Sequence, residues 1–144
     1  MPEKETLERA QRDKREGKAP STQAGEFVRE EIEHVREGKH GARSTKQAIA
    51  IGLSKARRAG VELPPPTSGS EETKEQAARD IRKARSGGKK SAKRASATRK
   101  ALKREGRSAA SKEALSRQAR SAARKRSAAS RSRSAKKAAA TRKK

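Results

Sequence analysis

His34 and His40, the only histidines of the chain, are the first candidates for metal or acid–base chemistry. Glu30 precedes His34 by four residues, a spacing that a helix places on one face and that metal sites use. The sequence offers no evident third ligand for this pair, and it contains no cysteine. We therefore expect a solvated or capping role for the pair, with no metal ion and no cofactor.

The many serines give no sign of nucleophilic catalysis. They lie in low-complexity sequence with no base nearby, and a nucleophilic serine needs a positioned base. No phosphate-binding glycine loop, dinucleotide fingerprint or zinc pattern occurs. The sequence therefore predicts no catalytic residue and a protein that is not an enzyme.

Lysine and arginine offer a different chemistry, the binding of phosphate. Residues 1–70 hold 14 Lys/Arg against 11 Asp/Glu, whereas residues 71–144 hold 27 against 6. Such an excess favours a polyanion, because each phosphate that is neutralised releases a condensed counterion. The residues expected to bind nucleic acid are Lys89, Lys90, Lys93, Arg94, Arg99, Lys100, Lys103, Arg104, Arg107, Arg117, Arg120, Arg124, Lys125, Arg126, Arg131, Arg133, Lys136, Lys137, Arg142, Lys143 and Lys144.

The expected partner is double-stranded DNA, bound without sequence preference. RNA or the ribosome is the alternative, because phosphate contacts do not separate the two nucleic acids. The chain has no Tyr or Trp on which single-stranded bases could stack. A third interpretation is a protein-interaction module, in which an acidic helix at 23–37 recruits a protein and the tail localises it. No segment resembles a membrane span or a secretory signal, so we expect a cytoplasmic, nucleoid-associated protein without membrane contact.

The elements that would carry these residues are helical. Large apolar side chains lie mostly before residue 65, and Phe27 is the only aromatic residue. The predicted fold class is small all-α, a helical hairpin plus short flanking helices, with a long disordered or conditionally helical basic C-terminal tail. The predicted parts are a charged helix within 1–20, the hairpin at 21–63, a Pro/Ser/Gly linker at 64–70, a short amphipathic helix at 71–86 and the tail at 87–144.

The hairpin has the clearest local signals. Its helices are predicted at about 23–37 and 45–59, with a Ser44–Gln47 capping box at the start of the second helix and Gly60 at its end. The predicted hairpin core is Phe27, Val28, Ile32, Val35, Ile49, Leu53 and Val61. This core is small for a unit that folds alone, so self-association into a homodimer would enlarge it. A helix-turn-helix is less favoured, because the GKHGARS turn is long and helix 23–37 is acidic.

The basic tail, residues 87–144, is rich in Ala and Arg, which favour helix, but its like charges oppose helix formation. We expect stretches such as 92–104 and 112–126 to become helical when phosphate relieves this repulsion. The helix predicted at 3–16 has little apolar surface and is expected to fray.

The segment FVREEIEHVREGKHGARSTKQAIAIGLSKARRAGVELPPP resembles an uncharacterised family of small basic bacterial proteins. The recurring element of that family resembles KQAIAIGLSKARRAG, residues 46–60. Its members are described as DNA-binding, histone-like or plasmid-stabilisation proteins, and the resemblance implies such a role without catalytic residues. The tail resembles those of linker histones and bacterial histone-like proteins, but it lacks proline and is richer in Arg and Ser.

Overall fold

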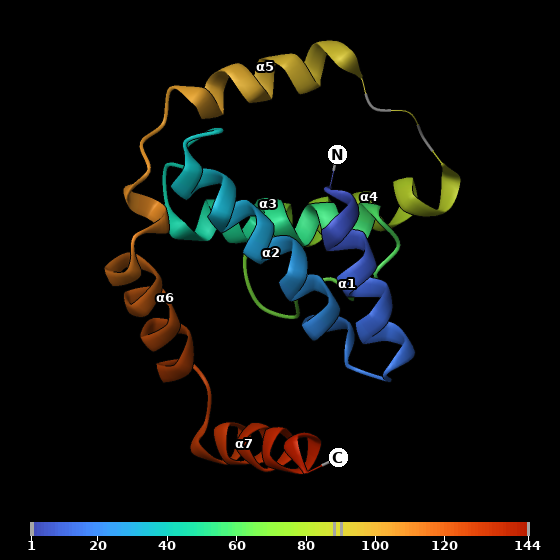
Figure 1. The fold of residues 1–144 in the computed structure, drawn as a ribbon, viewed down its shortest axis with the longest axis vertical. Coiled ribbons are helices and arrows are strands. Elements are labelled where there is room, and N and C mark those ends of the chain that lie inside the picture. The colour runs from blue at the N-terminus through green and yellow to red at the C-terminus, as the bar shows by residue number, and fades with distance from the viewer. Residues whose placement is uncertain (1, 88, 90, 144) are drawn as a thin grey trace.

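The computed structural model describes residues 2–87, 89 and 91–143, and every regular element in these ranges is helical (Figure 1). The N-terminal helices are α1 (Lys4–Arg15), α2 (Pro20–Glu37), α3 (Thr45–Arg58) and α4 (Glu71–Ser86). The C-terminal ones are α5 (Ala92–Lys103), the short 3-10 helix η1 (Ser108–Ala110), α6 (Lys112–Arg124) and α7 (Ala128–Arg142). Figure 1 shows α5 to α7 as an arc around the packed helices α1 to α4. The all-helical class is therefore confirmed.

The hairpin of α2 and α3 forms where the sequence predicts it, because its boundaries are set by local signals. Ser44 Oγ accepts a hydrogen bond from Gln47 N at 3.1 Å, and Gln47 Oε1 accepts one from Arg43 N at 2.7 Å. Val61 N donates to Ala56 O at 3.0 Å, which closes a Schellman end around Gly60 at φ 97°. The start of α2 differs from the prediction, since Pro20 occupies its first turn and extends it toward the N-terminus.

The apolar core is divided into two clusters. One contains Phe27 and Ala24 of α2, Ala10 of α1 and Ala56 of α3, with Leu7, Leu53, Val61 and Leu63 packed against it. The other contains Ile32, Val35, Ala42 and Ala48 together with Ala109 and Ala110 of η1, and Val28 and Leu115 pack against it. Of the predicted core residues, Phe27, Ile32 and Val35 are buried, while Val28, Leu53 and Val61 are half-buried. Ile49 is half-buried and lies in neither cluster.

Two segments outside the hairpin enlarge this core. Helix α1 was expected to fray, but Leu7 and Ala10 pack beside Phe27. Residues 109, 110 and 115 of the tail extend the other cluster. The area that a homodimer was expected to supply is thus partly supplied by the chain itself.

Helix α4 joins α3 mainly through a buried carboxylate. Asp80, which is 1% exposed, accepts hydrogen bonds from Ser54 Oγ at 2.6 Å, Arg58 Nε at 2.9 Å and Gln76 Nε2 at 3.1 Å. Ala77, three residues before Asp80, is the other buried residue of this helix. The 71–86 segment is therefore attached by a satisfied polar network more than by apolar area.

The expectation of a disordered tail does not agree with the structure, because most of residues 91–143 lie in helices. Ser91, Ser111 and Ser127 each accept a hydrogen bond from the backbone N–H three residues later, at 3.4, 3.1 and 3.1 Å. These serines are N-caps, which lower the cost of starting a helix. The stretches 92–104 and 112–126, which were expected to become helical on phosphate binding, nearly coincide with α5 and α6.

Because α2 and α3 cross closely, we expect alanine substitutions at two glycines to have opposite effects on stability. A Cβ on Gly52 would lie 2.6 Å from Val28 Cα and 2.9 Å from Val28 N, whereas a Cβ on Gly25 would meet nothing within 4 Å. We expect Gly52→Ala to destabilise the chain by about 1–3 kcal/mol, because backbone atoms must separate. Gly25→Ala should stabilise it by about 0.5–1 kcal/mol through helix propensity. Urea unfolding followed by circular dichroism measures both, and equal midpoints would contradict the close crossing.

Candidate nucleic-acid interface

The basic tail displays its cations on the outside of α5, α6 and α7. The tail, residues 87–144, holds 22 Lys/Arg; Lys90 and Lys144 lie outside the described residues, and the other 20 are all exposed. Among the predicted residues, Lys93, Arg94, Arg99, Lys100 and Lys103 lie on α5, Arg117, Arg120 and Arg124 on α6, and Arg131, Arg133, Lys136, Lys137 and Arg142 on α7. Lys89, Arg104, Arg107, Lys125, Arg126 and Lys143 lie between or beside these helices. Lys112, which the prediction omitted, is exposed at the start of α6.

These cations are not neutralised within the chain. In the described part of the tail, no Lys or Arg side chain makes an ion pair, although such pairs occur in α1 to α4. The backbone carbonyls of two residues accept hydrogen bonds from tail arginines: Arg107 Nη1 donates to Arg36 O at 3.4 Å, and Arg126 Nη2 donates to Ser130 O at 3.1 Å. The described surface of the tail is therefore an array of exposed positive charges that form no ion pair.

Helices α5, α6 and α7 contain no fully buried residue. The cations of α5 and α7 spread over much of the circumference of each helix, and Ala95 and Leu102 of α5 are half-buried. On α6, Ala114, Leu115 and Gln118 are half-buried, while Arg117, Arg120 and Arg124 are exposed. Helix α6 packs against α3 and η1 through this half-buried side.

The tail is joined to the hairpin by the anchor, residues 106–111. Ala109 and Ala110 are 6% and 1% exposed, and their carbonyl oxygens accept hydrogen bonds from Thr45 Oγ1 at 2.6 Å and Arg36 Nε at 2.9 Å. Ala42 N donates to O of Gly106, the first residue of the anchor, at 3.1 Å. Gly41 N donates to Leu102 O, just before the anchor, at 2.8 Å. The turn between α2 and α3 thus pairs with the chain at residues 102–110 and holds α5 and α6 on either side.

The sequence contained a signal for the anchor that the prediction did not use. Glu105 and Glu113 are the only acidic residues after residue 85, and Gly106, Ala109, Ala110 and Leu115 interrupt the basic pattern around them. A local fall in charge with small and apolar residues is typical of a packed segment. Which surface it packs against was not predictable from spacing.

Three of the four cations of α3 are engaged inside the fold, while Lys46 is exposed. Lys55 pairs with Glu31, Arg58 pairs with Asp80, and buried Arg57 donates to Leu63 O at 3.3 Å and to Pro64 O at 3.1 Å. Burial lowers the pKa of the Arg57 guanidinium. A recognition helix would need these side chains free for a groove, so the structure gives the helix-turn-helix interpretation no support.

The acidic residues of α2 are likewise engaged. Glu30 and Glu31 are 3% and 0% exposed, Glu33 pairs with Arg29 at 3.0 Å, and Glu37 pairs with Lys39 at 3.2 Å. Glu26 lies 3.7 Å from Arg9. In the third interpretation this acidic helix recruits a protein, and these pairings engage its acidic side chains within the chain.

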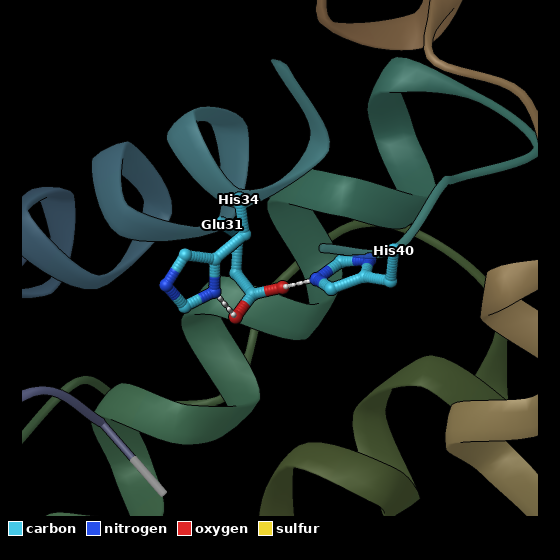
Figure 2. A group of neighbouring side chains, drawn as sticks. All are labelled: Glu31, His34 and His40. Carbon is cyan, nitrogen blue, oxygen red and sulfur yellow. Dashed lines mark ion pairs between the residues drawn. The ribbon is translucent and has the colours of Figure 1, made fainter. Parts of the chain in front are cut away.

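A buried charge network surrounds the two histidines. Figure 2 shows the Glu31 carboxylate between the rings of His34 and His40, with Glu31 Oε1 3.9 Å from His34 Nδ1 and Oε2 3.1 Å from His40 Nε2. The pair Glu30 and His34, singled out by its spacing, has its Oε1 and Nε2 atoms 3.7 Å apart. Glu3, at the start of α1, completes a second group with them. Hydrogen bonds from His34 and Lys39 lower the pKa of the Glu3 carboxyl.

Residues 4–67 match the model of a family of unknown function (DUF6496). The matched segment covers α1, α2, α3 and the prolines, and it includes Glu31, His34 and His40; α4 and the basic tail lie outside it. No curated protein and no solved structure matches the chain. Among the described residues, no helix has both the length and the apolar content needed to cross a bilayer.

Proposed function

We propose that this chain is a non-enzymatic protein that binds duplex DNA without sequence preference, through phosphate neutralisation by its basic tail. The observation that carries the proposal is the array of 20 exposed Lys/Arg side chains without ion-pair partners on and beside α5, α6 and α7. Arginine forms paired hydrogen bonds with phosphate oxygens, and both residues release counterions when they neutralise phosphates. A nucleoid- or plasmid-associated, histone-like role is the cellular setting that this activity suits.

The arrangement supports backbone contacts more than base readout. The cations of α5 and α7 spread over much of the circumference of each helix, so neither helix presents one narrow basic face to insert in a groove. Base readout requires a few side chains held at fixed positions against base edges, usually from a helix with a packed opposite face. The tail instead offers many similar cations along an arc, and such cations can contact the phosphates of DNA of any sequence.

The proposal predicts equal binding to unrelated DNA sequences. The full-length chain should bind two duplexes of the same length but different sequence with dissociation constants within about threefold of each other at low salt. Fluorescence anisotropy measures both constants, with a duplex RNA of equal length as a third ligand. A sequence preference beyond about a hundredfold, of the size that specific readout provides, would contradict the proposal. A tenfold preference for RNA would favour the RNA-binding alternative.

A further inference from the structure

Glu31, His34 and His40 converge in one buried place near the C-terminal end of α2. Glu31 and His34 lie three residues apart on that helix, and His40 follows in the turn that begins at Gly38, φ 78°. One ligand atom from each residue lies within 4.8 Å of the other two. The Glu31 side chain is fully buried and both rings are 13% exposed, so water competes little with a ligand there.

Hydrogen bonds on the outer side of each ring fix which nitrogen faces inward. His40 Nδ1 lies 2.9 Å from Gly41 O, and His34 Nε2 lies 2.9 Å from Glu3 Oε1. A carbonyl and a carboxylate can only accept, so these two nitrogens carry the protons. The other ring nitrogens, His34 Nδ1 and His40 Nε2, face Glu31, and such a nitrogen can act as a metal ligand through its lone pair.

Three acceptors therefore face one another. Glu31 Oε2 is buried and accepts no hydrogen bond from the described residues, although His40 Nε2 is only 3.1 Å away. Lys55 pairs with the other oxygen, Oε1, and leaves Oε2 available. Acceptor atoms this close are stabilised by a proton or a metal ion that lies between them. Metal-binding histidines commonly donate an outer hydrogen bond of the kind made here to Gly41 and Glu3.

We propose that Glu31 Oε2, His34 Nδ1 and His40 Nε2 bind a divalent transition-metal ion of the Zn²⁺ type, with an open fourth position. Zinc takes imidazole and carboxylate ligands at about 2.0–2.2 Å, which places tetrahedral ligand atoms about 3.3 Å apart. Glu31 Oε2 lies 3.1 Å from His40 Nε2, close to this value, and the other Glu31 oxygen, Oε1, lies 3.9 Å from His34 Nδ1. One ligand atom from each of the three residues lies within 4.8 Å of the other two, so an ion between them needs only a small side-chain movement.

The bound ion would fix the turn on which the tail is docked. His40 is adjacent to Gly41 and Ala42, whose N–H groups donate to Leu102 O and Gly106 O. Through His34 and Glu3, the same ion is linked to the start of α1. The site is independent of the phosphate-binding residues, so it is tested without nucleic acid.

Cobalt(II) titration of the full-length chain, without added chelator, tests this proposal. Co²⁺ takes the place of Zn²⁺ and gives intense visible bands only in a tetrahedral site. We expect one equivalent to produce these bands and Zn²⁺ to abolish them. His34→Gln and His40→Gln should each weaken binding at least about a hundredfold, and Glu3→Ala about tenfold, since it removes only an outer partner.

Glu33→Gln is the matched control, because Glu33 lies on the same helix and pairs only with Arg29 among the described residues. This variant should bind Co²⁺ as the unchanged chain does. Circular dichroism checks that each histidine variant keeps its helices, and a variant that loses them is set aside in favour of the other. Absence of tetrahedral bands in the unchanged chain would overturn the proposal, as would equal Co²⁺ affinity in a folded histidine variant.

Discussion

Gly41→Ala is expected to release the anchor from the hairpin while α1 to α3 stay folded. A Cβ at this position would lie 2.6 Å from Gly106 O and closer still to the Glu105 carbonyl group. These are backbone atoms, which cannot move aside as the end of a flexible side chain could. Opening the contact loses two backbone hydrogen bonds and the burial of Ala109 and Ala110. At about 1 kcal/mol for each bond and 0.8 kcal/mol for each methyl group, the loss is about 3–4 kcal/mol.

Hydrogen exchange measures this effect directly. The amide of Ala42, together with the amides of residues 108–118, should exchange at least about a hundredfold faster in Gly41→Ala than in the unchanged chain. Gly106→Ala is the control from the opposite side of the contact, because a Cβ on Gly106 meets nothing within 4 Å. Protection around Phe27 should persist in both variants, since that cluster contains no tail residue. Unchanged exchange in Gly41→Ala would show that the tail does not dock as described.

Neutralising α5 and α7 is expected to weaken DNA binding on the order of a thousandfold at about 0.1 M salt. Neither helix buries a residue, so changing its cations to glutamine removes charge without disturbing the packed helices. The variant carries ten changes at Lys93, Arg94, Arg99, Lys100, Lys103, Arg131, Arg133, Lys136, Lys137 and Arg142. These are half of the 20 described cations of the tail, so about five of ten phosphate contacts should be lost.

A matched pair of smaller variants separates the contribution of the tail's cations to DNA binding from the effect of net charge. One changes the five α7 cations to glutamine, and the other changes five exposed cations of the N-terminal half, namely Arg12, Lys14, Arg15, Arg43 and Lys46. Both variants lose the same formal charge. Only the α7 variant should bind DNA more weakly than the unchanged chain by more than about tenfold, as measured by fluorescence anisotropy. Equal losses would mean that the tail is not the binding surface.

Local signals made the helices of the hairpin predictable. Ser44 and Gln47 start α3 and Gly60 ends it through short-range hydrogen bonds that the residue types specify. The same kind of signal was present in the tail, where Ser91, Ser111 and Ser127 cap helices, but the low apolar content was taken to mean disorder. Capping acts even where little apolar area is buried.

The buried charge network around His34 and His40 was harder to predict from the sequence, because it depends on contacts between elements. Glu31 belongs to the predicted acidic helix 23–37, yet Phe27, Glu31 and Val35 follow one another at intervals of four residues and share a face. Its burial was therefore predictable, while its partners were not. Lys55 and His40 approach it from another helix and a turn. The docking of Ala109 on the hairpin, 64 residues from Thr45, likewise has no local signal.

The salt dependence of DNA binding by the full-length chain tests the central claim most directly. If about ten tail cations contact phosphates at once, the logarithm of the binding constant should fall against the logarithm of salt concentration with a slope of about −9. The variant neutralised on α5 and α7 should give a slope of about −4.5, half that value. The measurement covers about 50–200 mM salt with one duplex. A slope of about −2 or weaker for the unchanged chain, or the same slope for both proteins, would contradict phosphate neutralisation by the tail.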